Sequence, residues 1–221
     1  MEFYHVLNRG VDKRNIFIND RDRFRFIHDL FEFNNNKVIE TSSRKFTSTN
    51  MSDIGCRTLV KQPRELLVNI CAFCLMPNHY HLMISPRVTG GISKFMHKLN
   101  MGYTKYFNIK YDRQGALFQG KYKHVLIERD NQFTYLPHYI HLNPLDLEAP
   151  EWRNGRLNNP KEAHRFLKSY RWSSLLDYSG IDNFPSILNK KILDKLLTQQ
   201  KICDTKDWIR ELNINDSIII E

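Results

Sequence analysis

The sequence has few cysteines, no long apolar run and no segment typical of an export signal. Its four cysteines are sparse and unevenly placed over 221 residues, unlike the disulfide frameworks of small secreted domains, so we expect reduced thiols. It contains no run of about 18 uninterrupted apolar residues. Residues 1–9 lack the basic and apolar stretches of a secretory signal. These absences predict a cytoplasmic protein without a membrane partner.

A glycine-rich phosphate loop and an internal repeat are also missing, so the sequence gives no support to ATP-dependent or NAD-dependent chemistry. What the chain does have is positive charge. Lys and Arg total 33 against 24 Asp and Glu, which gives a net charge of +9 and a pI of about 9.4. Such an excess suits a polyanionic partner such as nucleic acid, although a basic pI alone discriminates weakly.

The spacing of apolar residues predicts an α+β domain. Strands are expected at 3–7, 66–76, 79–85 and 122–128; helices are expected after a cap at Asp20, at 92–107, and from a cap at Asp130 to a point before Pro144. Pro137 is expected to kink or restart the last helix. This order is that of a ferredoxin-like split βαβ fold, with an antiparallel sheet and helices on one side.

The chain divides by composition into a catalytic core and an extension. Residues 1–145 are expected to form the core, interrupted at 35–65 by a polar stretch with little apolar periodicity, which we interpret as an insertion loop. Residues 146–221 are expected to form a mostly helical C-terminal extension. Neither the role of the insertion nor that of the tail at 181–221 follows from the sequence.

A His-x-His pair is the first candidate for chemistry. His79 and His81 alternate along a predicted strand, so both imidazoles emerge from the same face and can share one metal ion. Such a pair is only a modest signal, because most histidines are ordinary surface or packed residues. Cys71 and Cys74 lie nearby but three positions apart, which places them on opposite faces unless a bulge intervenes. We interpret both as buried core thiols.

Tyr139 and Asn143 are four residues apart on a predicted helix and so project from one face. A tyrosine hydroxyl there would lie beside an amide oxygen. Two histidines and one amide oxygen suit a labile Mg²⁺ or Mn²⁺ site better than a closed zinc site. Tyr135 lies one turn earlier on the same face, and spacing alone hardly separates the two tyrosines as candidate nucleophiles.

Basic residues interleaved with aromatics between 97 and 129 predict contacts with DNA, because cations neutralise phosphates and exposed rings stack on unpaired bases. Most of the aromatic residues fall on the apolar stripe of the helix and are expected in the core. The expected DNA-contacting residues are Arg9, Arg14, Lys94, Lys98, Lys105, Lys121 and Lys123.

Several segments together resemble one family. Residues 76–82 (MPNHYHL) are similar to the His-hydrophobic-His signature of single-tyrosine HUH transposases, specifically the REP-associated tyrosine transposases. Further similar segments are residues 4–10 with 16–17, 117–123 (LFQGKYK), 139–144 (YIHLNP) and 172–174 with Tyr178. The stretch 35–65, the position of Pro137 and the tail beyond about residue 180 depart from the pattern.

The resemblance implies Tyr139 as the nucleophile rather than Tyr135, and His79, His81 and Asn143 as ligands of the divalent metal. It implies cleavage and rejoining of single-stranded or hairpin DNA from palindromic repeats, through a 5′-phosphotyrosine intermediate. The target sequence, the acceptor of the tyrosine proton and the choice between monomer and homodimer stay open.

Three other interpretations compete. A domesticated transposase that binds hairpins without cleaving them is disfavoured because all four expected site residues are present. A relaxase or replication initiator would bring a helicase or another large domain, for which 221 residues leave no room. A zinc hydrolase built on His79 and His81 would lack a nearby carboxylate as general base.

Overall fold

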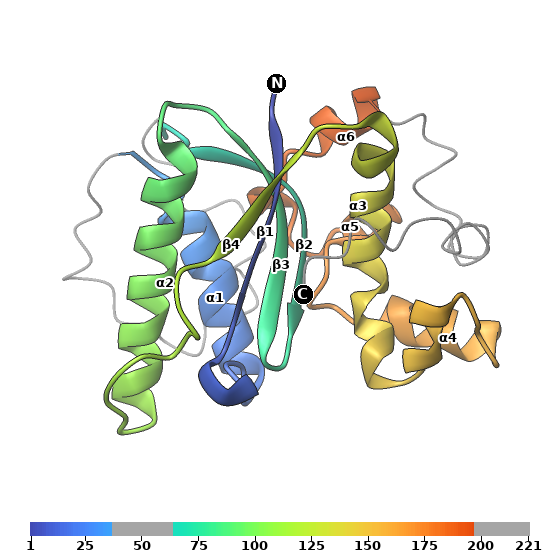
Figure 1. Ribbon diagram of the computed structural model, residues 1–221, viewed down its shortest axis with the longest axis horizontal. Helices are drawn as coiled ribbons and strands as arrows, with labels where there is room; N and C mark the ends of the chain where they lie inside the picture. The colour runs from blue at the N-terminus through green and yellow to red at the C-terminus, as the bar shows by residue number, and fades with distance from the viewer. Residues whose placement is uncertain (37–63, 197–221) are drawn as a thin grey trace.

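The computed structural model describes residues 1–36 and 64–196, and Figure 1 shows a twisted sheet with helices on both sides. The strands are β1 (Phe3–Arg9), β2 (Val68–Met76), β3 (His79–Pro86) and β4 (Lys123–Ile127). The α-helices are α1 (Asp20–Glu32), α2 (Gly91–Lys110), α3 (Asp130–Leu142), α4 (Pro160–Ser169), α5 (Leu175–Tyr178) and α6 (Lys190–Leu196). Short 3-10 turns are η1 (Val11–Lys13), η5 (Asn143–Leu147), η6 (Pro150–Asn154) and η7 (Pro185–Ile187).

The sheet has the order β2-β3-β1-β4, and every neighbouring pair is antiparallel. With α1 between β1 and β2, and α2 between β3 and β4, this is the ferredoxin-like order that the sequence predicts. The α+β fold class is therefore confirmed. The register pairs Leu7 with His81 and Arg9 with His79. The C-terminal end of β1 therefore lies beside the N-terminal end of β3, which holds the two candidate histidines.

One face of the sheet packs against α1 and α2, as the apolar stripes of both helices predict. Phe26 of α1 and Tyr103 of α2 are buried with their ring centroids 5.0 Å apart, and Tyr80 of β3 lies 4.8 Å from Phe26. The Phe26–Tyr103 pair is edge-to-face, a geometry that stabilises a core beyond the area that it buries.

The other face packs against α3 and the C-terminal extension, so helices lie on both sides of the sheet rather than on one (Figure 1). The physical reason is that β1, β2 and β3 carry buried apolar side chains on their second face too, beside the histidines. Phe3, Cys74 and Met83 are buried there against Leu136 and Ile140 of α3. Withdrawing that surface from water needs a second layer of helices.

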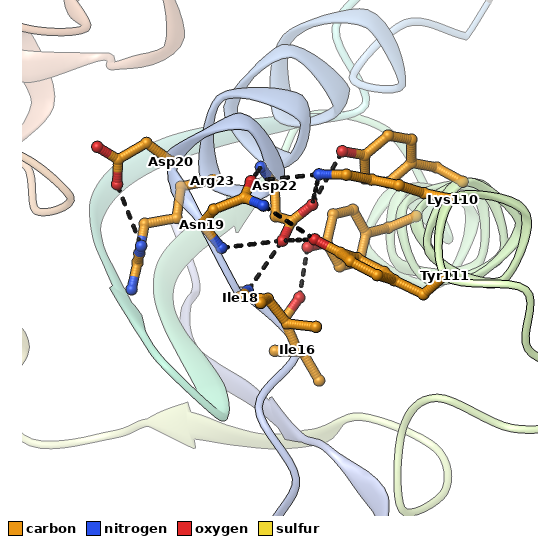
Figure 2. A network of polar contacts seen from close by, with 10 residues as sticks. Ile16, Ile18, Asn19, Asp20, Asp22, Arg23, Lys110 and Tyr111 are labelled. Atoms are coloured by element: carbon orange, nitrogen blue, oxygen red, sulfur yellow. Dashed lines mark hydrogen bonds and ion pairs between the residues drawn. The ribbon is translucent and has the colours of Figure 1, made fainter.

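A buried carboxylate joins the start of α1 to the end of α2 (Figure 2). Asp22 accepts hydrogen bonds from Lys110 at 2.6 Å, from the Tyr111 hydroxyl at 2.7 Å and from the backbone N–H of Ile18 at 2.8 Å. The helix cap is Asn19 rather than the expected Asp20. Asn19 accepts from the Asp22 backbone N–H while Asp22 accepts from that of Asn19, a reciprocal capping box.

Helix α3 runs without interruption from Asp130 to Leu142, so the expected restart at Pro137 does not occur. Every residue from 136 to 142 is buried against the sheet or the extension, and this packing compensates for the backbone hydrogen bond that a proline removes. The helix begins at Asp130, and its N-cap is Arg129 rather than the expected Asp130; the side chain of Gln132 accepts from the Arg129 backbone N–H at 3.3 Å. It ends before Pro144, as predicted.

The extension covers the free edge of β2. Ser173 forms a bridge with Cys74, and the Leu75 N–H donates to the Trp172 carbonyl at 2.9 Å. The Tyr178 hydroxyl donates to the Cys71 carbonyl at 2.6 Å. An edge strand otherwise exposes unpaired backbone groups. These contacts pair the outer edge of β2 and join residues 170–178 to the sheet.

Most of the stretch predicted as an insertion lies outside the described residues, as do residues 197–221 of the tail. The two ends of the stretch are described, and they meet: the Asn36 N–H donates to the Glu65 carbonyl at 2.8 Å. Lys98 of α2 donates to the Asn35 carbonyl at 2.6 Å. The insertion therefore leaves and re-enters the fold at one point beside α2. Among the helices of the described ranges, none has the length and apolarity to span a membrane.

Candidate active site

The two histidines of the His-x-His pair lie on the face of β3 that is covered by α3. Strand alternation places His79 and His81 on the same side, and their ring centroids are 4.9 Å apart. Both are buried, with exposed fractions of 7% and 1%. On the neighbouring strands they face Arg9 and Leu7 of β1, and Met76 and Cys74 of β2.

Each of these histidines has one ring nitrogen in a hydrogen bond and one without a partner. His79 donates from Nδ1 to the Asn78 side-chain oxygen at 2.6 Å, and His81 Nδ1 lies 2.9 Å from Nε2 of His5. Both Nε2 atoms are buried and have no hydrogen-bond partner. Burial lowers the pKa of His79 to about 4 and holds the pKa of His81 well below its usual value, so both rings are neutral at pH 7.

Tyr139 projects from α3 onto the histidines. Its ring is 2% exposed and lies edge-on to His81 and His5, with centroid distances of 5.6 and 5.9 Å. Tyr135 stacks one turn away at 6.1 Å and is half-buried. The Tyr139 hydroxyl accepts a hydrogen bond from Nη1 of Arg153 at 3.4 Å.

Asn143 follows α3 as its C-cap and is completely buried. Its amide nitrogen donates to the Tyr139 carbonyl at 2.7 Å, which fixes the orientation of the side chain. The amide oxygen accepts from Nη2 of Arg153 at 3.4 Å. The oxygens of Tyr139 and Asn143 therefore face the same guanidinium, as expected from their spacing of four residues.

These residues fit a labile divalent cation. The observation that carries the fit is the pair of buried, unpartnered Nε2 atoms on neutral imidazoles, because a polar atom buried without a partner is costly. The Asn143 oxygen has a second lone pair beyond its contact with Arg153. Within residues 1–36 and 64–196, no group of three or more His, Cys, Asp and Glu side chains is arranged to hold a metal. A cation here would therefore depend on Asn143 and on solvent or substrate oxygens, which suits Mg²⁺ or Mn²⁺.

The cysteines near the pair are buried thiols, as predicted. A β-bulge between Ile70 and Ala72 shifts the register, so Cys71 and Cys74 both lie in the core beneath α3 instead of on opposite faces. Burial raises the pKa of Cys71 to about 12 and that of Cys74 well above its usual value. Protonated thiols are poor metal ligands, so the pair does not extend the site.

The expected DNA-contacting residues fall into two groups on different sides of the sheet. Arg9, Lys121 and Lys123 line a cavity of about 270 Å³ beside the histidines, and Arg14 follows in the loop after β1. Lys94, Lys98 and Lys105 lie on α2, which packs on the opposite face of the sheet from α3, the helix that carries Tyr139 (Figure 1). The structure thus brings Arg9, Lys121 and Lys123 to the side of the sheet that carries the histidines, because Arg9 pairs with His79 and Leu7 pairs with both His81 and Lys123. It keeps the lysines of α2 on the other side.

Three residues of the site were not singled out in the sequence. His5 of β1 is buried against His81, Arg153 of η6 reaches the Tyr139 oxygen, and Asp146 of η5 binds Arg153. His5 had a signal, because it shares a face with Leu7 at a spacing of two on a predicted strand. No local pattern marks Arg153, since its place depends on the path of the chain after α3.

The fold and the site together define an α+β domain in which two histidines of strand β3 face a tyrosine of helix α3. The sequence model of a protein family described as "Transposase IS200 like" matches residues 30–143, about half of the chain. The chain belongs to this family of transposases, so the family predicted from its motifs is confirmed at this level. The match ends at Asn143, so Arg153 lies beyond it.

Among solved structures, one described as a REP-associated tyrosine transposase bound to a REP hairpin is similar, with a TM-score of 0.47 and 10% identity. The alignment covers 84% of this chain and 82% of that one. No curated protein sequence matches the chain.

Proposed function

We propose that this transposase is a metal-dependent single-stranded DNA endonuclease and strand transferase that acts on hairpin-forming DNA through a 5′-phosphotyrosine. Tyr139 is the nucleophile, and His79, His81 and Asn143 hold the divalent cation, Mg²⁺ or Mn²⁺. The support is the packing of Tyr139 against His81, which lies beside His79, and the shared contact of the Tyr139 and Asn143 oxygens with Arg153. Two buried imidazole nitrogens without a partner add to it.

The reaction follows from the chemistry of a phosphodiester. The Tyr139 oxygen forms a bond to phosphorus, the bond from phosphorus to the 3′ oxygen breaks, and the tyrosine proton passes overall to that leaving oxygen. The phosphotyrosine conserves the energy of the phosphodiester, so a second 3′ hydroxyl can reverse the step without ATP. When bound, the cation supplies positive charge that polarises a non-bridging phosphate oxygen.

The residues of the chain have separate tasks in this scheme. The neutral rings of His79 and His81 would hold the cation through Nε2, His81 in the tautomer whose Nδ1 donates to His5, and Asn78 and His5 contact the other ring nitrogens. The hydrogen bond from Asn143 to the Tyr139 carbonyl ties the amide to the helical turn that carries the nucleophile. The burial of the site excludes bulk water, which would otherwise compete with a 3′ hydroxyl for the phosphotyrosine.

The test is the covalent adduct. Wild type and Tyr139→Phe are incubated with Mg²⁺ or Mn²⁺ and a labelled single-stranded hairpin from DNA flanking the gene, then run on a denaturing gel. We expect a slow-migrating band in wild type alone, with hairpin binding nearly equal in both. An adduct or cleavage that persists in Tyr139→Phe would show that the nucleophile is another residue.

A second candidate is a domesticated transposase that binds hairpins and does not cleave them. The observation in its favour is the 2% exposure of Tyr139, because a phosphate reaches this oxygen only after side chains around it move. Hairpin binding without any adduct, over several flanking sequences and with either metal, would favour this candidate.

A further inference from the structure

Arg153 is a cation from the extension that reaches into the candidate site. It lies in η6, ten residues beyond the end of the family match, and its side chain is 23% exposed. Its guanidinium forms a two-point ion pair with Asp146, with Nε to Oδ1 at 2.9 Å and Nη2 to Oδ2 at 2.6 Å. This fork geometry fixes the plane of the group as well as its position.

Further contacts hold the ion pair in place. The Trp152 indole N–H donates at 2.7 Å to Oδ1 of Asp146, the oxygen that also accepts from Nε of Arg153. The guanidinium carbon lies 5.0 Å from the centre of the Trp152 ring. Trp152 itself is buried. Asp146 and Trp152 therefore position Arg153 before any substrate arrives, so little ordering is needed at the moment of reaction.

The other N–H groups of the guanidinium point at the reacting centre. Nη1 donates to the Tyr139 hydroxyl oxygen and Nη2 to the Asn143 oxygen, each at 3.4 Å. These distances are long for hydrogen bonds, so they leave room to shorten as charge develops. The guanidinium carbon also lies 5.6 Å from the centre of the Tyr139 ring. Burial opposes the charge, but the contacts with Asp146 and Tyr139 outweigh it and raise the pKa of Arg153, so the group stays a cation.

We propose that Arg153 is a catalytic residue of the strand-cleavage reaction, donating to the Tyr139 oxygen and placing positive charge where the attacking and phosphate oxygens carry negative charge. The inference rests on the proposed function. As the bond from oxygen to phosphorus forms and the bond to the 3′ oxygen breaks, Arg153 gains and loses no proton. Asp146 acts through Arg153 and is a positioning residue.

A purely structural role is the competing explanation, because the Arg153–Asp146 pair also connects η6 to η5. The two roles differ in what replaces the side chain. An ion pair that connects η6 to η5 needs a side chain attached to the backbone of η6, so a free cation cannot replace it. Positive charge beside the Tyr139 oxygen can instead be supplied by a small cation in the space that Arg153→Ala leaves. Restoration by free guanidinium therefore separates them.

The experiment measures adduct formation in a single turnover, with saturating protein and the labelled hairpin from the gene's flanks. It compares wild type, Arg153→Ala, Arg153→Lys and Arg156→Ala; Arg156 is an exposed arginine three residues on and serves as the matched control. We expect Arg153→Ala to slow the adduct by about 100-fold, the range found when one donor to a developing oxyanion is removed. Arg153→Lys, which keeps the charge without the fork, should lose less, and Arg156→Ala should match wild type.

Two further readouts complete the test. Hairpin affinity should stay within about twofold in Arg153→Ala, because the predicted loss is in the transition state. Guanidinium chloride at non-denaturing concentration should restore Arg153→Ala, whereas sodium chloride at equal ionic strength should not.

The outcomes separate the inference from the proposed function. Absence of an adduct in wild type would contradict the proposed function itself. An adduct at an equal rate in wild type and Arg153→Ala would overturn the inference alone. A slow Arg153→Ala that guanidinium does not restore, with a lowered melting temperature also in Arg153→Lys, would assign Arg153 to structure and likewise overturn it.

Discussion

At the residue scale, the candidate site depends on two imidazoles that are buried and neutral, each held in orientation by a contact at its Nδ1. Asn78 and His5 occupy one nitrogen of His79 and of His81, and the remaining nitrogens are buried together without partners. A protein pays for such atoms unless a ligand uses them. This arrangement resembles the way metalloproteins fix a ligating ring through its second nitrogen.

We predict that His81→Ala abolishes both Mn²⁺ binding and the DNA adduct. The substitution removes one of two nitrogen donors, and the remaining His79 and Asn143 offer too few ligands to hold a labile ion. Calorimetry with Mn²⁺ alone measures the first effect, and the denaturing gel measures the second. His97→Ala, at an exposed histidine of α2, is the control. Mn²⁺ binding of wild-type strength in His81→Ala would remove His81 from the site.

We predict a smaller effect for His5→Ala. His5 contacts His81 through one ring nitrogen, so its loss leaves the ligands present and removes the support of one ring. Loss of such a supporting partner lowers metal affinity by about 10- to 100-fold in known sites. The same Mn²⁺ titration measures the effect. An unchanged affinity would mean that packing beneath α3 alone orients His81.

At the element scale, the helices α1 and α2 are joined by the Asp22 network of Figure 2. The Asp22 carboxyl is 0% exposed, and burial by itself raises its pKa. The hydrogen bonds from Lys110, Tyr111 and the backbone of Ile18 and Asn19 together outweigh burial and lower the pKa below the usual 3.8. The ionised carboxylate therefore stabilises the folded state above this pH, and the contribution is lost as the pH falls through the lower folded value.

We predict that Asp22→Asn lowers the free energy of unfolding by about 2 kcal/mol at pH 7, the typical contribution of hydrogen bonds to a charged group. The deficit should shrink at a pH below 3.8, where the wild-type carboxyl also becomes protonated. Urea unfolding at both pH values measures it. Asp20→Asn is the matched control, because Asp20 is 69% exposed and its surface ion pair with Arg23 contributes less than about 1 kcal/mol. Equal effects of the two substitutions would contradict the role of the network.

Local periodicity explains which elements the sequence predicts well. The period of two places His79 and His81 on one face, and a separation of four residues brings Tyr139 and Asn143 together, because each relation is set inside one element. The position of α3 on the second face, the bulge beside Cys71 and the contact of Arg153 are relations between elements. They depend on register and loop path, which period and spacing do not encode.

At the scale of the whole molecule, the sheet separates a face that carries the candidate site from a face that is covered by α1 and α2. The histidine side is covered by α3 and the extension, and the cavity lined by Arg9, Lys121 and Lys123 opens beside it. The other side carries α1, α2 and the meeting ends of the polar stretch. In the proposed reaction, a hairpin whose cleaved strand reached Tyr139 would meet Arg9, Lys121 and Lys123 before the lysines of α2.

We predict that the double variant Lys121→Ala with Lys123→Ala weakens hairpin binding and lowers the salt dependence of its affinity by roughly one to two units of log K per log salt, because each lost phosphate contact removes about 0.7 to 0.9. Lys94→Ala with Lys105→Ala removes the same charge from exposed positions of α2 and should lower that slope less. Binding titrations from low to moderate salt measure both. If the slope falls equally in the two double variants, the DNA also contacts α2 around the edge of the sheet. A loss of net charge by itself would not explain that result, because the field of a surface charge is screened within about 10 Å at 0.1 M salt.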